Sequence, residues 1–249
     1  MQFYYQQLSE RKQQIYRTLK DAVESRSVEC FLYDLTLTRE QIGDVMMLVL
    51  LDYPDYYWTK GNFYIYRENN FSQPRLRIRI VYLFDDRQML LAESEMQKQI
   101  KKCCEAVGRY QAYGVREFVL QVCNWVYQNV EYQYTGDKDQ TIYSVFCEKK
   151  SVCMGISKAA ALVLRLFGIN SIVVKGKLFG KHPHSWLIVL VNQRYYHLDI
   201  TLGYPCFDEL WQRNQGQPER YCILKDDEWI SNTHDFDKRY HYPICGGDV

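Results

Sequence analysis

The stretch from about residue 151 to residue 201 constrains the fold most, because an apolar helix pattern is followed there by several strand patterns. Residues 153–167 are apolar on most sides and stop at Gly168, which predicts a buried helix. Asn192-Gln193 separates two later apolar runs and predicts a hairpin turn. A buried helix beside antiparallel strands indicates an α+β fold. Strands are expected over 171–178, 185–191 and 194–199.

Three side chains in this stretch have the chemistry of a nucleophile system. Cys153 stands at the start of the predicted helix, where unpaired N–H groups and the helix dipole favour a thiolate. His184 precedes one strand pattern and Asp199 ends the next. A thiol, an imidazole and a carboxylate in this order predict acyl transfer at sulfur. Gly155 is expected to leave open space near that sulfur.

The predicted hairpin gives the imidazole and the carboxylate a geometry. With Asn192-Gln193 as a two-residue turn, Asp199 lies opposite Trp186, and His184 is two positions further along the same face. Diagonal neighbours of this kind are about 7–8 Å apart at the backbone, within side-chain reach. A turn one residue longer would destroy this parity.

Two other histidines compete for the role of base. His182 has the same facing as His184, but its place beside Pro183 indicates a loop residue. His197 shares the facing of Asp199 and has no obvious carboxylate opposite it in the sequence. Each residue alone is more often structural than catalytic; the combination favours catalysis by Cys153, His184 and Asp199.

The N-terminal third has its own patterns. Residues 2–24 indicate an amphipathic helix, and Thr38 is a candidate N-cap for a helix that ends at Asp52. A hairpin of alternating residues is expected around 63–82, with arginines on a solvated face. We place a boundary near residue 86, which gives an N-terminal α+β region (1–86) and a catalytic domain (87–249). Further elements are expected over 28–37, 89–109 and 115–130.

Composition excludes several classes of protein. The 31 Lys+Arg against 30 Asp+Glu give a net charge of +1, so no nucleic-acid partner is expected. Nine scattered cysteines, with no C-x-x-C pair, argue against a disulfide scaffold and a zinc knuckle, so neither metal nor cofactor is expected. No signal peptide or membrane span is predicted, which favours a cytoplasmic protein without membrane partners.

These motifs together resemble the transglutaminase-like superfamily of cysteine enzymes, in which the core is papain-like. The resemblance covers roughly residues 115–202 and is closest to uncharacterised bacterial members. The matching positions are Ser151-Val-Cys153-Met-Gly155, Leu166-Phe-Gly168-Ile169, Gly176, His184-Ser-Trp186 and Tyr195-Tyr-His-Leu-Asp199-Ile-Thr201.

The resemblance implies both fold and chemistry. It implies a helix with the nucleophile, packed on an antiparallel sheet that carries the base and the carboxylate, behind an N-terminal α+β extension. It assigns the triad to Cys153, His184 and Asp199. It implies attack on a protein or peptide amide carbonyl, with a thioester that an amine or water resolves. Tyr134 and Trp186 are weaker candidates for the oxyanion or substrate site.

The chain departs from better-studied members of that superfamily. The first ~110 residues do not have the pattern of an immunoglobulin-like sandwich. Asp137-Lys-Asp139 lacks the glycine and terminal glutamate of a calcium loop, and paired zinc-binding cysteines are missing. These departures make an extracellular transglutaminase or a glycan-removing enzyme a weaker prediction.

The sequence leaves the exact function open. A cysteine protease and a transamidase or deamidase share the same thioester, and only the nucleophile that resolves it differs. A non-catalytic protein-interaction module with an idle triad is the alternative from another class. A third and weaker idea is recognition of a peptide by the arginine face of residues 75–79. The substrate and the oligomeric state cannot be predicted.

Overall fold

The computed structural model describes residues 2–204 and 224–246. The chain divides into two compact units, Met1–Met89 and Leu90–Val249, and each is described by itself. Within the described residues no helix has the length and apolar character needed to cross a membrane.

The first unit combines two helices with a small antiparallel sheet. Its strand order is β1-β3-β2, and α1 packs against α2. A capping box begins α2: the Thr38 side chain accepts from the Gln41 backbone, and the Gln41 side chain accepts from the Thr38 N–H. The elements are η1 (Tyr5–Gln7), α1 (Glu10–Glu24), β1 (Glu29–Leu32), α2 (Arg39–Asp52), β2 (Phe63–Glu68) and β3 (Arg75–Ile80).

The first helix starts later than the periodicity predicted. It begins at Glu10 rather than near residue 2, because a separate turn forms before it. The buried carboxylate of Asp52 accepts from the backbone N–H of Tyr4 and of Tyr5, each at 3.1 Å. It also accepts from the hydroxyl of Tyr16 at 2.8 Å. This contact between distant residues fixes the chain start in a conformation that periodicity does not encode.

The arginine face of β3 is confirmed, and its charges are paired. Leu76, Ile78 and Ile80 are buried on the other face. Arg75 lies 2.8 Å from Glu68, and Arg77 lies 2.9 Å from Glu29. Internal ion pairs therefore already occupy two of the guanidinium groups that a peptide ligand would need.

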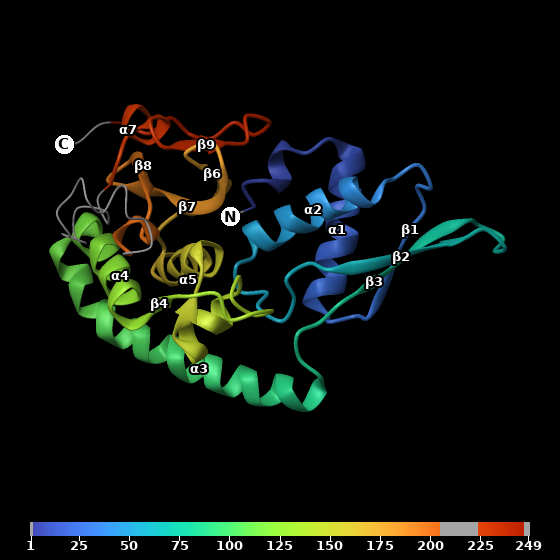
Figure 1. The fold of residues 1–249 in the computed structure, drawn as a ribbon, viewed down its shortest axis with the longest axis horizontal. Helices are drawn as coiled ribbons and strands as arrows, with labels where there is room; N and C mark the ends of the chain where they lie inside the picture. The colour runs from blue at the N-terminus through green and yellow to red at the C-terminus, as the bar shows by residue number, and fades with distance from the viewer. Residues whose placement is uncertain (1, 205–223, 247–249) are drawn as a thin grey trace. The chain divides into compact units, whose positions relative to one another are not determined.

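The second unit contains most of α3, the longest described helix at 23 residues, and a four-stranded antiparallel sheet of order β8-β7-β6-β9. Figure 1 shows its strands in orange and red, with α5 beside them. The predicted α+β class is confirmed. The elements are α3 (Asp86–Gly108), η2 (Arg109–Tyr113), α4 (Val115–Asn129), β4 (Glu131–Tyr132), η3 (Ser144–Glu148), β5 (Lys150–Ser151), α5 (Cys153–Leu166), β6 (Ser171–Leu178), β7 (His182–Val191), β8 (Arg194–Leu198), η4 (Thr201–Gly203), α7 (Asp227–Ser231) and β9 (His234–Phe236).

The helix α5 lies on β6 and β7, as the apolar pattern predicted. Its alanines Ala159, Ala160 and Ala161 are all completely buried, which lets the helix approach the sheet closely. The Ser157 hydroxyl donates to the carbonyl of Ser185 at 3.0 Å and ties the helix to β7. The helix ends before Gly168, whose φ of 78° is the left-handed conformation of a helix C-cap.

Candidate active site

Cys153 is the first residue of α5 and follows β5 after one residue. Val152 precedes it with an extended backbone, and the Val152 N–H donates to the carbonyl of Asp139 at 3.2 Å. Cys153 is partly exposed. The thiol thus lies at the helix start, where unpaired N–H groups favour an anion.

Gly155 has a different role from the one predicted. It does not leave open space: a Cβ there would lie 2.2 Å from the Ser151 Oγ. It would also lie 2.8 Å from the carbonyl oxygen of Asp139 and 2.9 Å from that of Thr141. The glycine therefore allows the loop before α5 to pack against its first turn, and this packing holds Cys153 in place.

Gly155→Ala is expected to lower the free energy of unfolding by about 1–3 kcal/mol or more, because two backbone carbonyls cannot move away from the added methyl group. Gly43→Ala, in α2, is the matched control. Its nearest neighbour would be the Phe63 ring at 3.9 Å, so the helix preference for alanine should stabilise it by up to about 1 kcal/mol. Urea unfolding measures both; equal stabilities would contradict this packing.

The hairpin of β7 and β8 has the predicted register. Asn192 and Gln193 have φ values of 48° and 68°, as a two-residue turn of type I′ requires. Leu187 pairs with Leu198 and Val191 with Arg194, which is the predicted pairing. The parity argument is therefore confirmed.

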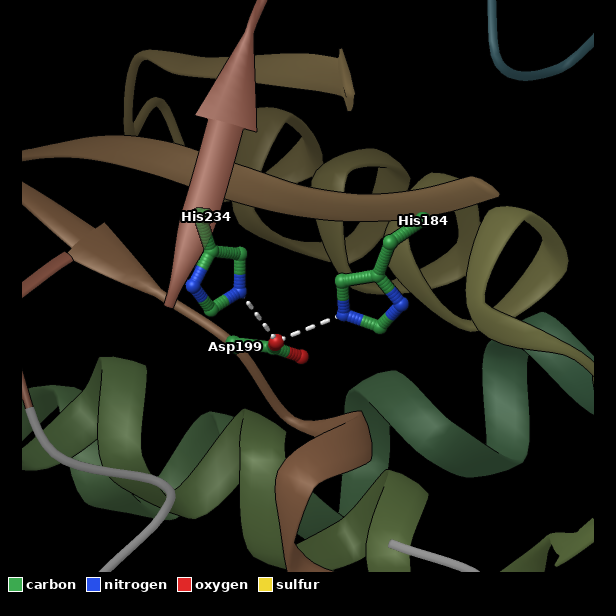
Figure 2. Close-up of side chains that lie close together, drawn as sticks. All are labelled: His184, Asp199 and His234. Atoms are coloured by element: carbon green, nitrogen blue, oxygen red, sulfur yellow. Dashed lines mark hydrogen bonds and ion pairs between the residues drawn. The ribbon is translucent and has the colours of Figure 1, made fainter. Parts of the chain in front are cut away.

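The register brings His184 and Asp199 into direct contact. The His184 Nε2 lies 2.7 Å from the Asp199 Oδ2, and both side chains are buried (Figure 2). The other carboxylate oxygen, Oδ1, accepts from the Thr201 backbone N–H at 2.9 Å and from the Thr201 hydroxyl at 2.6 Å. Burial by itself would raise the pKa of Asp199, but His184 and then His234 outweigh it and hold that pKa well below its usual range.

His184 lies between the carboxylate and the thiol. Burial would lower the pKa of His184, but Asp199 and, after it, Cys153 outweigh burial and raise that pKa to about 10. The imidazole is therefore protonated at neutral pH. Since Nε2 is bonded to Asp199, Nδ1 is the ring nitrogen left to face the sulfur. The structure thus brings Cys153, His184 and Asp199 together.

A second imidazole, which the sequence reasoning missed, contacts the same carboxylate. The His234 Nε2 lies 3.0 Å from the Asp199 Oδ2, so two imidazoles meet one oxygen (Figure 2). His234 is on β9, 35 residues after Asp199 in the chain, so no short-range sequence pattern could have predicted the contact between them. The one signal in the sequence is scarcity, because the chain has only 5 histidines.

Trp186, a candidate for the oxyanion or substrate site, lies in the core of the second unit. Its side chain is completely buried, and its indole N–H donates to the His197 Nδ1 at 3.1 Å. That N–H is the only donor of the side chain, so here it is not offered to a substrate oxygen. Its ring packs edge-on against His234, with centroids 4.7 Å apart.

His197 has a carboxylate partner that the sequence did not reveal. Its Nε2 lies 2.8 Å from the Asp227 Oδ1, and Asp227 belongs to α7, 30 residues further on. Burial is the largest effect on His197 and lowers its pKa, so this ring is neutral. His182, the other predicted competitor, is exposed, but it is not in the predicted loop: β7 begins at His182, which pairs with Leu178 of β6.

The tyrosine beside the thiol is Tyr132 rather than Tyr134. Tyr134 is 76% exposed. Burial first, and then the neighbouring Cys153, raise the pKa of Tyr132, which places its hydroxyl next to the sulfur. Parallel pairing of β4 with β5 sets Tyr132 opposite Ser151 and so directs it to the start of α5.

Two groups of described residues could offer three ligand atoms each to a metal ion: His184, Asp199 and His234, and separately His197, Asp227 and Cys245. In the second group, the Trp186 N–H occupies the His197 Nδ1, so the ring proton sits on Nε2, the atom that would bind the metal. In the first group, the Nε2 atoms of His184 and His234 are hydrogen-bonded to the Asp199 Oδ2, at 2.7 and 3.0 Å. Hydrogen bonds therefore account for the close approach of the side chains in both groups.

A family model described as the transglutaminase-like superfamily matches residues 105–200. That segment belongs to the transglutaminase-like superfamily. The transglutaminase-like segment contains Cys153, His184 and Asp199 and stops before His234. The family predicted from the motifs is thereby confirmed. Among curated proteins, none matches this chain.

Solved structures similar to part of this chain include three with 13–15% identity. One described as a TGase has 15% identity, covers 55% of this chain and 43% of its own, and has a TM-score of 0.39. A candidate cysteine protease from Cytophaga hutchinsonii has 15% identity, coverage of 56% and 62%, and a TM-score of 0.38. A candidate protease from Parabacteroides distasonis has 13% identity, coverage of 55% and 35%, and a TM-score of 0.31. The chain thus matches less than two thirds of each.

Proposed function

We propose that residues 87–249 act as a cysteine acyltransferase or protease on protein or peptide amide carbonyls. Cys153 is the nucleophile, His184 the acid and base, and Asp199 the group that orients His184. The observation that carries the proposal is the position of the His184 ring, which has Asp199 on Nε2 and the Cys153 thiol on its other side. A buried imidazole paired in this way serves both steps of acyl transfer.

The proposed reaction begins with the thiolate of Cys153. Its sulfur attacks the amide carbon, and the carbonyl oxygen takes the negative charge of the tetrahedral intermediate. As the C–N bond breaks, the His184 imidazolium gives its Nδ1 proton to the leaving nitrogen. A thioester remains on Cys153, and neutral His184 takes a proton from the water or amine that attacks it. Water gives hydrolysis, and an amine gives transamidation.

The oxyanion needs donors at the start of α5. The backbone N–H of Cys153 belongs to the first turn, where N–H groups have no partner within the helix. We assign one donor to this N–H and propose the Tyr132 hydroxyl, beside the sulfur, as a neighbouring group. We propose no such role for Tyr134 or Trp186, given their positions.

Iodoacetamide at pH 6 is expected to alkylate Cys153 well before the other eight thiols, because the His184 imidazolium stabilises the thiolate. Cys104 and Cys147 are internal controls, since they are also partly exposed. Burial raises the pKa of both, to about 11 for Cys147. Mass spectrometry of the labelled peptides measures the three rates. Equal rates would favour a non-catalytic interaction module.

A second measurement tests acyl transfer itself. p-Nitrophenyl acetate is expected to acetylate Cys153, and hydroxylamine is expected to remove the acetyl group, as it does from a thioester. Cys153→Ala should take up no acetyl group at this position while Cys104 and Cys147 behave as in the wild type. Wild-type protein that is alkylated rapidly but never acetylated would contradict the proposed chemistry.

A further inference from the structure

Two imidazoles contact Asp199, and the reaction proposed above uses only that of His184. It gives no role to His234. His234 is completely buried on β9, and its Nε2 is 3.0 Å from the Asp199 Oδ2. An ionised carboxylate only accepts hydrogen bonds, so His234 must donate its Nε2–H. This is the same oxygen that holds the His184 Nε2 (Figure 2).

Both ring nitrogens of His234 have defined partners. Its Nδ1 lies 2.7 Å from the Thr233 hydroxyl, which can donate to it. The same hydroxyl also lies 3.4 Å from the Ile230 carbonyl oxygen, which accepts from it. The Trp186 ring lies edge-on to the same imidazole, at 4.7 Å between centroids. The imidazole of His234 is therefore fixed in orientation.

The carboxylate that results is held on both oxygens. Thr201 donates twice to Oδ1, at 2.9 and 2.6 Å, and the two imidazoles donate to Oδ2. A carboxylate with these partners cannot rotate without losing several buried hydrogen bonds. The position of Oδ2 in turn sets the position of the His184 ring.

The approach of β9 depends on a missing side chain in β6. Gly176 pairs with Phe236, and a Cβ on Gly176 would lie 2.2 Å from the Asp235 carbonyl oxygen. It would also lie 2.8 Å from the Trp186 ring. The glycine thus lets β9 and the indole lie close enough for His234 to reach Asp199.

We propose that His234 is a positioning residue, which fixes Asp199 so that His184 is held at the Cys153 thiol. The inference rests on the proposed thiol chemistry and adds to it a fourth side chain. The His234 ring lies tilted beside the His184 ring, with centroids 5.5 Å apart, and the hydrogen bond by which we infer that it acts is the one to Asp199.

Two substitutions separate the hydrogen bond from the rest of the side chain. The amide nitrogen of glutamine reaches the position of the His Nε2, whereas that of asparagine reaches only the position of Nδ1. His234→Asn is expected to slow iodoacetamide alkylation of Cys153 at pH 6 by about tenfold or more. His234→Gln keeps a donor to Asp199 and is expected to remain within about threefold of wild type.

Thermal unfolding and a pH series from 5 to about 9 accompany these rates. A purely structural role would lower the melting temperature of His234→Asn without a change in the pH dependence of alkylation, and that result overturns the proposal. Equal alkylation rates for His234→Asn and wild type overturn the proposal as well. So does an equal loss of alkylation rate in His234→Asn and His234→Gln. If His234→Asn does not fold, Thr233→Val removes the partner of Nδ1 instead, and an unchanged rate there overturns the proposal.

The wild type distinguishes this inference from the function on which it rests. If wild-type Cys153 reacts no faster than Cys104 and Cys147, the proposed function fails, and the role of His234 fails with it. If the wild type reacts rapidly and His234→Asn does too, only the role of His234 fails.

Discussion

His184→Ala is expected to reduce acyl transfer by about 10²- to 10⁴-fold, the usual contribution of a general acid and base. The variant loses the proton donor for the leaving nitrogen and the cation that stabilises the thiolate. Because the pKa of His184 is raised to about 10, the imidazolium persists from acid to mildly alkaline pH. The advantage of the wild type over the variant in the rate at which iodoacetamide alkylates Cys153 should therefore hold from about pH 6 to 9.

His182→Ala is the matched control for this prediction. His182 lies on the same strand with the same facing but is exposed, so its removal should leave both rates unchanged. Acetylation by p-nitrophenyl acetate and alkylation of Cys153 are measured over the pH series for both variants. If both substitutions changed the two rates equally, or if His184→Ala changed neither rate, the assignment of His184 as the base would be contradicted.

Asp199→Ala is expected to lower the free energy of unfolding by about 3–5 kcal/mol, the usual cost of removing one partner from a buried ion pair. The substitution leaves the His184 imidazolium without its carboxylate and leaves the donors of His234 and Thr201 without an acceptor. All of these groups are buried, so water cannot replace the lost oxygen atoms.

The loss of stability should depend on pH in a defined direction. The pKa of Asp199 is lowered in the folded state, so its stabilisation is present above its unfolded pKa of about 4 and is lost as pH falls. The pKa of His184 is raised, so its stabilisation is present below about 6.5 and is lost as pH rises toward 10. The difference between wild type and Asp199→Ala should be largest between about pH 4 and 6.5.

Urea unfolding at acid, near-neutral and alkaline pH measures this difference. Asp227→Ala is the matched control, since Asp227 also pairs with a histidine, at 2.8 Å, but its side chain is 44% exposed. Water can solvate His197 from that side, so the loss should be smaller. An Asp199→Ala variant that is as stable as Asp227→Ala at every pH would contradict the buried-pair interpretation.

The elements that local pattern predicts well are those in which local interactions dominate. Thr38 and Gln41 form the predicted capping box because both partners lie within one turn. The start of α1 was misplaced because Asp52, distant in the chain, binds the backbone of Tyr4 and Tyr5. Periodicity contains no information about such a contact.

The same distinction applies to the candidate site. The two-residue turn at Asn192-Gln193 and the period of two in a strand are local, so the sequence by itself determined that His184 and Asp199 share a face. It also determined that Cys153 begins a buried helix.

Only the tertiary structure decided which other groups meet these three. Antiparallel pairing of β9 with β6 brings His234 to Asp199, and α7 brings Asp227 to His197. Both contacts join residues 30 or more positions apart. Such pairings depend on side-chain volume where the segments meet. Between β6 and β9, Gly176 has no side chain, and the order of residues along the chain does not show that a side chain there would clash.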